Sequence, residues 1–339
     1  MALGAMVLAI IASSGSAPSV PHQAKAASIS DVKLYQAISE AVSQGRPYYE
    51  AAAAIQRANG YPTAPGQVIR EPALAYLLAS LRVEVIQAAL VGLMVGIIIQ
   101  LKRVLDREAR SMGARLGIIA CALTGLSFAG VPSAIYVHEV WAALLMALSL
   151  LLYRSDRWAP SIALAFAACV LRELAAPFIL AMGAAALIER RWAQALAWTL
   201  ALVAFAAFYA VHLHLAAQQF RAGDLRSQGW VYFGGPGFVI STLRFNLLLH
   251  FLPRPAAVAG ALLALLGLIG VRDPRTIRAA LIAAGYMAAF FVVGRPDNYL
   301  WGFLYTPFLG IGLAFAPAAI ADLFIRASCA RSPISGCQE

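Results

Sequence analysis

The sequence predicts an all-α polytopic membrane protein with about ten transmembrane helices, and two observations lead to this class. Of the 339 residues, 61% are hydrophobic and only 12% are charged, with a mean hydropathy of +0.75. A soluble domain carries roughly a quarter charged residues, so this composition excludes an ordinary soluble enzyme. The apolar residues also fall into successive runs that basic or polar segments separate. We therefore expect residues 1–339 to form a single transmembrane domain.

The distribution of charge predicts the orientation of the helices. The net charge is +10, but the arginines lie mostly between apolar runs, and no basic cluster is interleaved with aromatic residues as nucleic-acid binding would need. Cytoplasmic loops of membrane proteins carry an excess of Lys and Arg. The densest basic segment holds Lys102, Arg103, Arg107, Arg110 and Arg115. We place this segment and both termini in the cytoplasm, as in a multi-pass protein of a bacterial inner membrane.

The N-terminal part is expected to form one membrane helix followed by a large outer loop. Residues 2–12 are apolar, and no Lys or Arg precedes them, which favours a membrane helix over a signal peptide. Residues 14–82 then form the first outer, periplasmic loop. Within it, an amphipathic helix is predicted from Asp31 to about Gln44, with Ser30 as its N-cap. Pro72 suits the first turn of a further helix.

The remaining spans follow from the apolar runs. They are expected at about 83–101, 116–131, 140–153, 193–214, 256–271, 277–293 and 300–324. Residues 159–188 fit either one long helix or a hairpin. Basic residues flank both ends, and a single span would place one basic end outside, so we favour a hairpin with Arg172 and Glu173 at its outer tip.

A second large outer loop is predicted at residues 216–254. The apolar run 238–252 has only 15 residues and contains Arg244, Asn246 and His250. A span there would invert the rest of the chain and place Arg272, Arg275 and Arg278 outside, against the charge rule. We therefore interpret this run as an interfacial or re-entrant helix.

With this topology, ionisable residues from six stretches fall on the outer side. They are Asp31, Glu71, His138, Glu139, Arg172, Glu173, Arg244 and Asp297. Arg172 and Glu173 interrupt an apolar stretch, where a charged pair is costly unless it serves a site. Each residue also has a plainer interpretation. Asp31 suits a helix N-terminus, and Arg70 with Glu71 would make an exposed ion pair of little energetic value.

Several short motifs resemble the GT-C superfamily of polytopic glycosyltransferases. The shared pattern is a first helix, a large outer loop with an early acid, outer carboxylates on the next outer loop and many further spans. The early acid is Asp31 in SDVKLY, and the second acid is Glu139 in VHEVW. The cation for a donor phosphate is Arg172 in LRELAAP, and REPALAYLL and RPDNYLWG also resemble stretches of bacterial members.

The resemblance implies an inverting transfer of a sugar from a polyprenyl-phosphate donor to an acceptor hydroxyl on a glycan, lipid or protein at the outer face. Asp31 would act as the general base, with Glu71 and Glu139 as further catalytic carboxylates. The donor phosphate would be bound by Arg172, Arg70 and Arg244. Substrate-binding candidates are Tyr35, His138, Glu173, Asp297, Asn298, Tyr299 and Trp301. No cofactor follows with certainty, and a divalent cation at His138, Glu139 and Glu71 stays open.

Two alternatives remain beside the enzyme. A transporter or lipid flippase would favour internal repeats and polar groups near the midplane, and the sequence has no evident repeat. A membrane scaffold subunit would tolerate changes of the outer carboxylates. The sequence has no P-loop, no glycine-rich dinucleotide fingerprint and no GxSxG motif, which argues against a nucleotide-dependent enzyme or a serine hydrolase.

Overall fold

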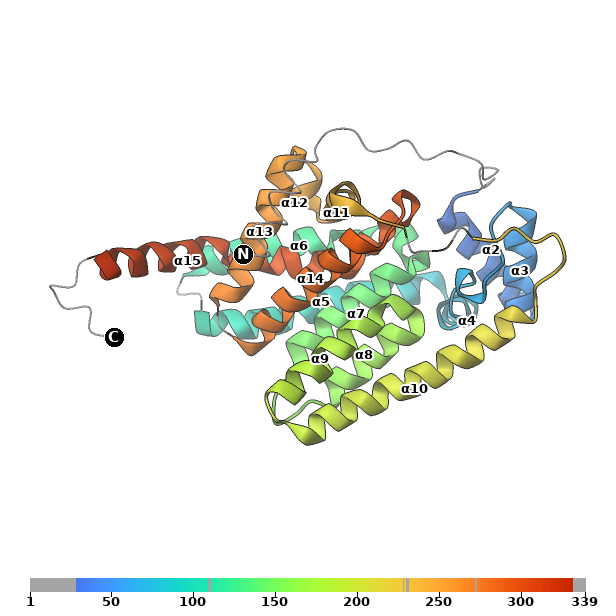
Figure 1. The fold of residues 1–339 in the computed structure, drawn as a ribbon, viewed down its shortest axis with the longest axis horizontal. Coiled ribbons are helices and arrows are strands. Elements are labelled where there is room, and N and C mark those ends of the chain that lie inside the picture. Colours follow the sequence, from blue (N-terminus) through green and yellow to red (C-terminus); the bar gives the residue numbers. More distant parts are fainter. Residues whose placement is uncertain (1–28, 109–110, 228, 230–231, 272, 332–339) are drawn as a thin grey trace.

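The structure, a computed structural model, describes residues 29–108, 111–227, 229, 232–271 and 273–331. Within these residues the chain is helical, and the one extended pairing is an isolated bridge between Ala64 and Arg226. The elongated molecule has its first described helices at one end and the end of its last helix at the other (Figure 1). The membrane helix that the sequence predicts before residue 14 lies outside the described residues.

The first outer loop folds as a small helical layer, here called the cap (residues 29–80). It contains α2 (Asp31–Ser43), α3 (Tyr48–Ala58), a 3-10 turn at Gly66–Val68 and α4 (Ala73–Ser80). The prediction for α2 is confirmed, because Ser30 caps it with its hydroxyl oxygen 3.5 Å from the backbone nitrogen of Lys33. Leu34 and Ile38 on α2 are buried against α3, so the cap has its own small apolar core.

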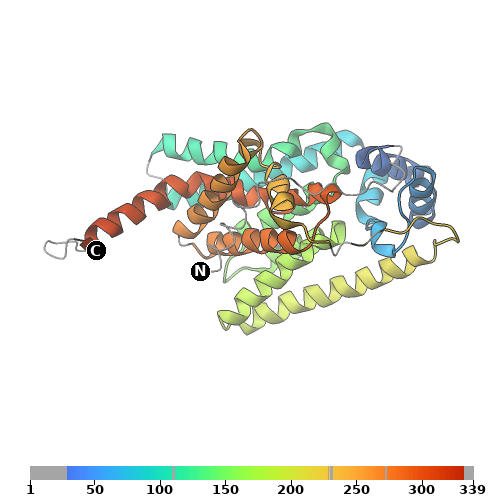
Figure 2. The same ribbon diagram turned by 45° about the horizontal axis from the view of Figure 1, so that its top comes forward.

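The helical bundle beside the cap holds the main hydrophobic core. Its helices are α5 (Val83–Glu108), α6 (Met112–Leu126), α7 (His138–Leu152), α8 (Ala159–Leu171), α9 (Ala176–Ile188), α10 (Trp192–Ala217), α13 (Arg254–Gly270), α14 (Pro274–Val292) and α15 (Thr306–Arg331). Nearly every residue of α7 is buried, so this helix lies inside the bundle. The rotated view shows α10 running along one side of the bundle toward the cap (Figure 2).

Four helices in the described part of the chain are long and apolar enough to cross a membrane. They are 83–103, 192–217, 274–292 and 306–326. Five shorter apolar helices of 10–17 residues accompany them. The chain is thus an α-helical protein with helices suited to a lipid bilayer, and the count of about ten spans stays a prediction.

The helical hairpin predicted at residues 159–188 is confirmed. Helix α8 ends where Arg172 adopts an extended conformation (φ −156°, ψ 112°), and a 3-10 turn at Glu173–Ala175 leads into α9. The two far ends of the hairpin lie close together. The hydroxyl of Tyr153, which precedes α8, donates a hydrogen bond of 2.7 Å to Oε1 of Gln194, which follows α9. The basic residues that flank the hairpin therefore share one face of the bundle.

Two predicted elements near the C-terminal half were wrong in their bounds. The expected single helix at 238–252 is two helices, α11 (Gly235–Leu243) and α12 (Leu247–His250). The break occurs because buried Asn246 caps α12 and bonds to Thr124. The expected span at 300–324 begins later, because residues Pro296–Leu304 form a 3-10 segment, and α15 starts at Thr306.

Polar contacts attach the cap to α10 and to the second outer loop. Arg57 makes a two-point ion pair with Asp224, with Nε to Oδ1 at 2.5 Å and Nη2 to Oδ2 at 2.8 Å. The Ser227 amide donates to the Ala64 carbonyl at 2.8 Å. His212 on α10 lies 3.2 Å from the Tyr49 hydroxyl through Nδ1. The two loops that the sequence predicts on the outer side are therefore in direct contact.

Candidate functional site

Six ionisable side chains gather where the cap meets the bundle, and we call them the charged cluster. They are Arg70, Glu71, His138, Glu139, Arg172 and Glu173. They come from the segment before α4, the first turn of α7 and the break between α8 and α9. The sequence predicted all six as site residues, and the fold brings them together from three separate segments.

Arg172 lies at the centre of the cluster and is 1% exposed. Its Nη1 donates to both carboxylate oxygens of Glu173, at 2.5 and 2.6 Å. Its Nε lies 2.8 Å from Oε1 of Glu139, which is 2% exposed. A buried guanidinium is tolerated only when carboxylates pair with it. The ion pairs hold Arg172 at the point where α8 ends and the chain turns back.

Glu71 is 1% exposed and contacts Glu173. Its Oε1 accepts a hydrogen bond of 3.0 Å from the Glu173 amide, and its Oε2 is buried without a hydrogen-bond partner. Burial and then the negative charge of Glu173 hold the pKa of Glu71 well above its usual range. These surroundings favour the protonated form of Glu71. In that state the charges of Arg70 and Arg172 are balanced by Glu139 and Glu173.

Arg70 lies on the cap side of the cluster and is only partly buried. Its Nε donates to the Tyr35 hydroxyl at 3.0 Å, and its carbonyl accepts from the Tyr48 hydroxyl at 2.6 Å. The Tyr35 ring meets the His138 ring edge-on, with 4.8 Å between centroids. No ion pair joins Arg70 to a carboxylate in the part of the chain that the structure describes. This guanidinium retains donors for a ligand.

A small cavity lies beside Arg70, with Tyr35, Tyr48 and His138 among its lining residues. Its volume is about 10 Å³, close to the space that one water molecule fills. His138 Nδ1 is buried without a hydrogen-bond partner. The cluster is thus closed in this conformation, and a sugar does not fit beside Arg70.

Asp31 lies at the N-terminus of α2, one turn before Tyr35, and is partly exposed. Its Oδ1 accepts a hydrogen bond of 2.8 Å from the Tyr61 hydroxyl, whose other contact is the Ile29 carbonyl at 2.8 Å. Burial and then the charge of Asp31 raise the pKa of Tyr61. Sequence reasoning missed Tyr61, because Gly60-Tyr61-Pro62 signals only a turn.

Five predicted site residues lie in the 238–305 region, and their hydrogen bonds, ion pairs and ring contacts stay within it. Arg244 contacts the His250 carbonyl at 3.5 Å, and Asp297 pairs with Arg295 at 2.9 Å. Tyr299 stacks on Phe245, and Trp301 is buried against Phe238 and Phe290. Asn298 Nδ2 is buried without a hydrogen-bond partner.

The described residues contain no group of three or more His, Cys, Asp or Glu side chains placed to hold a metal ion. Within the charged cluster, the Arg172 guanidinium lies between Glu139 and Glu173. Arg172 therefore supplies the positive charge that a metal ion would supply between these carboxylates.

Comparisons with known proteins found no match among family models, curated proteins or solved structures. A functional conclusion must therefore come from the fold and from the geometry of the site.

Proposed function

We propose that this chain is a membrane glycosyltransferase of the GT-C type, which moves a sugar from a polyprenyl-phosphate donor to an acceptor hydroxyl at the outer face. The observation that supports it most is the proximity of a partly exposed acid to a cation that forms no ion pair with any described carboxylate. Asp31 and Arg70 are linked through Tyr35, which follows Asp31 by one helical turn and contacts Arg70 at 3.0 Å.

Asp31 is the proposed general base. Its carboxylate removes the proton of the acceptor hydroxyl as that oxygen attacks the anomeric carbon of the sugar. A bond forms between the acceptor oxygen and the anomeric carbon, and the bond from that carbon to the phosphate oxygen breaks. The electron pair leaves with polyprenyl phosphate. The hydrogen bond from Tyr61 to Oδ1 orients the carboxylate and leaves Oδ2 for the acceptor.

Arg70 is the proposed ligand of the departing phosphate. Guanidinium donors match phosphate oxygens and stabilise the charge that builds on them. Arg172 suits this role less well than the sequence predicted, because it is 1% exposed and two carboxylates already pair with it. We assign Arg172, Glu139 and Glu173 to positioning, since their ion pairs fix the wall against which Arg70 lies.

Access of the donor requires the cap to move away from α7. The cavity beside Arg70 has only about 10 Å³. Substrate-induced movement of a loop or domain is a common way to complete such a site and exclude water. Because the Arg57–Asp224 ion pair joins the cap to the second outer loop, we expect both to move together.

The test is sugar transfer in membranes supplied with radiolabelled polyprenyl-phosphate sugars. Asp31→Asn keeps the shape of the side chain and removes the base, so we expect transfer to be lost at normal protein levels. Glu40→Gln is the matched control, because Glu40 is an exposed carboxylate on the same helix. Full activity of Asp31→Asn would remove Asp31 from the mechanism. No transfer by the wild type from any donor would favour the transporter alternative.

A further inference from the structure

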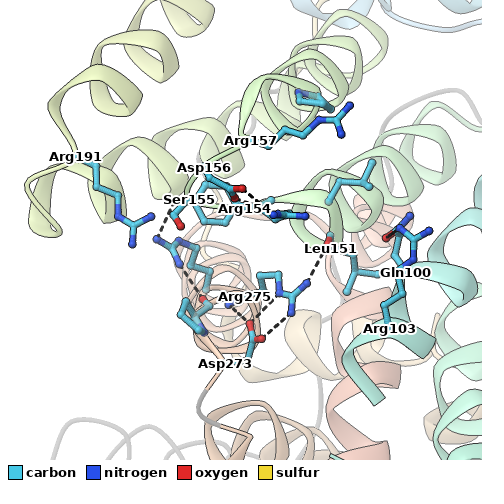
Figure 3. Close-up of a pocket in the computed structure, with 15 residues that line it drawn as sticks. Gln100, Arg103, Leu151, Arg154, Ser155, Asp156, Arg157, Arg191, Asp273 and Arg275 are labelled. Carbon is cyan, nitrogen blue, oxygen red and sulfur yellow. Dashed lines mark hydrogen bonds and ion pairs between the residues drawn. The ribbon is translucent and has the colours of Figure 1, made fainter. Parts of the chain in front are cut away.

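A large basic pocket lies at the opposite end of the bundle from the charged cluster, with a volume of about 690 Å³ (Figure 3). Helix α7 connects the two sites. It begins at His138 in the cluster and ends at Leu152 in the pocket wall, and its 15 residues span about 22 Å at a rise of about 1.5 Å per residue. The pocket is therefore independent of Asp31 and of the proposed transfer reaction.

The pocket carries an excess of positive charge. Its six arginines are Arg103, Arg154, Arg157, Arg191, Arg275 and Arg278. Three carboxylates pair with four of them among the described side chains: Asp156 with Arg154, Asp273 with Arg275, and Glu189 with both Arg191 and Arg278. These residues come from α5, from the α7–α8, α9–α10 and α13–α14 connections and from the first turns of α14. Figure 3 shows Arg191 and Arg103 on opposite sides of the view.

Arg278 forms a fixed, buried part of the wall. It is 4% exposed, it pairs with Glu189, and its Nη1 donates to the Pro274 carbonyl at 3.0 Å. Its guanidinium carbon lies 4.6 Å from the centre of the Tyr153 ring. Its Nε is buried without a hydrogen-bond partner. These contacts hold the positive charge of Arg278 in place at the pocket wall.

Of the six arginines of the pocket, Arg103 and Arg157 are exposed and make no ion pair with a described carboxylate. Arg103 donates only to the side chain of Gln100, at 3.1 Å. Two guanidinium groups that line a pocket and form no ion pair attract a phosphate group.

The pocket also has an apolar side, formed by Leu151, Leu152 and Pro160 at the ends of apolar helices. A free phosphate would gain nothing from these residues, whereas a lipid would place its glycerol and first acyl carbons against them. Basic pockets between helices on the basic side of membrane proteins bind anionic lipid head groups in this way. We propose that the basic pocket binds the phosphate of an anionic phospholipid in the leaflet at this face.

The test is native mass spectrometry of the full chain with phosphatidylglycerol or phosphatidylcholine, which differ in net charge. We expect phosphatidylglycerol to bind more tightly in the wild type. The double variant Arg103→Gln/Arg157→Gln should weaken this binding roughly thirtyfold, since each arginine near an anionic surface contributes about fivefold. The matched control Arg46→Gln/Arg221→Gln removes the same charge from exposed residues of the cap and second outer loop and should leave binding unchanged.

Three results would overturn the proposal. The first is equal binding of the two lipids by the wild type. The second is unchanged phosphatidylglycerol binding in Arg103→Gln/Arg157→Gln, or an equal loss in the control. The third is displacement of the lipid by glycerol 3-phosphate at the same concentration, which would assign the pocket to a soluble phosphate. None of these results depends on sugar transfer.

Discussion

Glu139→Gln and Glu71→Gln make the same chemical change within one buried cluster and should have opposite effects on stability. Glu139 is ionised and pairs with Arg172, which is 1% exposed. The change to glutamine leaves Arg172 with only Glu173 and gives the cluster an unbalanced positive charge. Burial beside Glu173 favours the neutral form of Glu71, and an amide of the same shape is neutral as well and keeps the acceptor for the Glu173 amide.

The expected magnitudes differ by several kcal/mol. Removal of one partner from a buried ion pair costs about 3–5 kcal/mol, which lowers the folded-to-unfolded ratio by roughly two to three and a half orders of magnitude. The raised pKa of Glu71 means that folding of the wild type at pH 7 must either take up a proton or bury an unfavourable charge, whereas glutamine is neutral in both states. We therefore expect Glu71→Gln to be more stable than the wild type at pH 7.

The assay is denaturant unfolding of both variants in detergent micelles, followed by circular dichroism and tryptophan fluorescence. Buried Trp141 and Trp198 report on the bundle core. Equal losses in the two variants would refute the assignment of the proton to Glu71. A Glu139→Gln variant as stable as the wild type would show that Arg172 does not depend on that carboxylate.

Three further outcomes follow from named contacts. Because the pKa of Glu71 is raised in the folded state, the stability of the wild type relative to Glu71→Gln should be highest below about pH 4.3, the unfolded pKa. It should fall as the pH rises through the folded pKa, and unfolding at several pH values will measure the trend. Gly267→Ala should cost about 1–3 kcal/mol, because the new methyl carbon would lie 2.1 Å from the Gly312 carbonyl oxygen where α13 crosses α15. Asp224→Asn should cost about 1 kcal/mol and loosen the cap, since Asp224 pairs with the partly exposed Arg57, and limited proteolysis will measure the loosening.

The controls for these outcomes come from the same chain. Gly92→Ala on α5 has open space around the new methyl group and should stabilise the helix slightly, so a loss equal to that of Gly267→Ala would contradict the packing argument. A flat difference between wild type and Glu71→Gln across pH would contradict the raised pKa. Unchanged proteolysis of Asp224→Asn would show that other contacts hold the cap.

Local signals in the sequence were sufficient for several elements. Ser30 and Asp31 marked the start of α2, because a cap and a first-turn acid are properties of adjacent residues. The hairpin at 159–188 followed from basic residues at both ends, since charge asymmetry decides which face each end occupies. Arg172 and Glu173 were identified because ionisable residues are rare in apolar surroundings, and the other four members of the charged cluster because the predicted topology places them on the outer side.

Tertiary contacts decided the features that the sequence did not reveal. The break between α11 and α12 depends on the bond between Asn246 and Thr124, which lie 122 positions apart. Tyr61 reaches Asp31 across 30 positions from a turn that shows no chemical signal of its own. The raised pKa of Glu71 depends on burial beside Glu173, and no residue near Glu71 in the sequence predicts that neighbour.

The proposed reaction is a single displacement at the anomeric carbon of the sugar, with Asp31 as the base and polyprenyl phosphate as the leaving group. The most direct measurement is the anomeric configuration of the product, determined by nuclear magnetic resonance after transfer by the purified protein from a donor of known configuration. We expect a product of opposite configuration to the donor from the wild type and no product from Asp31→Asn. A product of retained configuration, or an equal yield from Asp31→Asn, would contradict it.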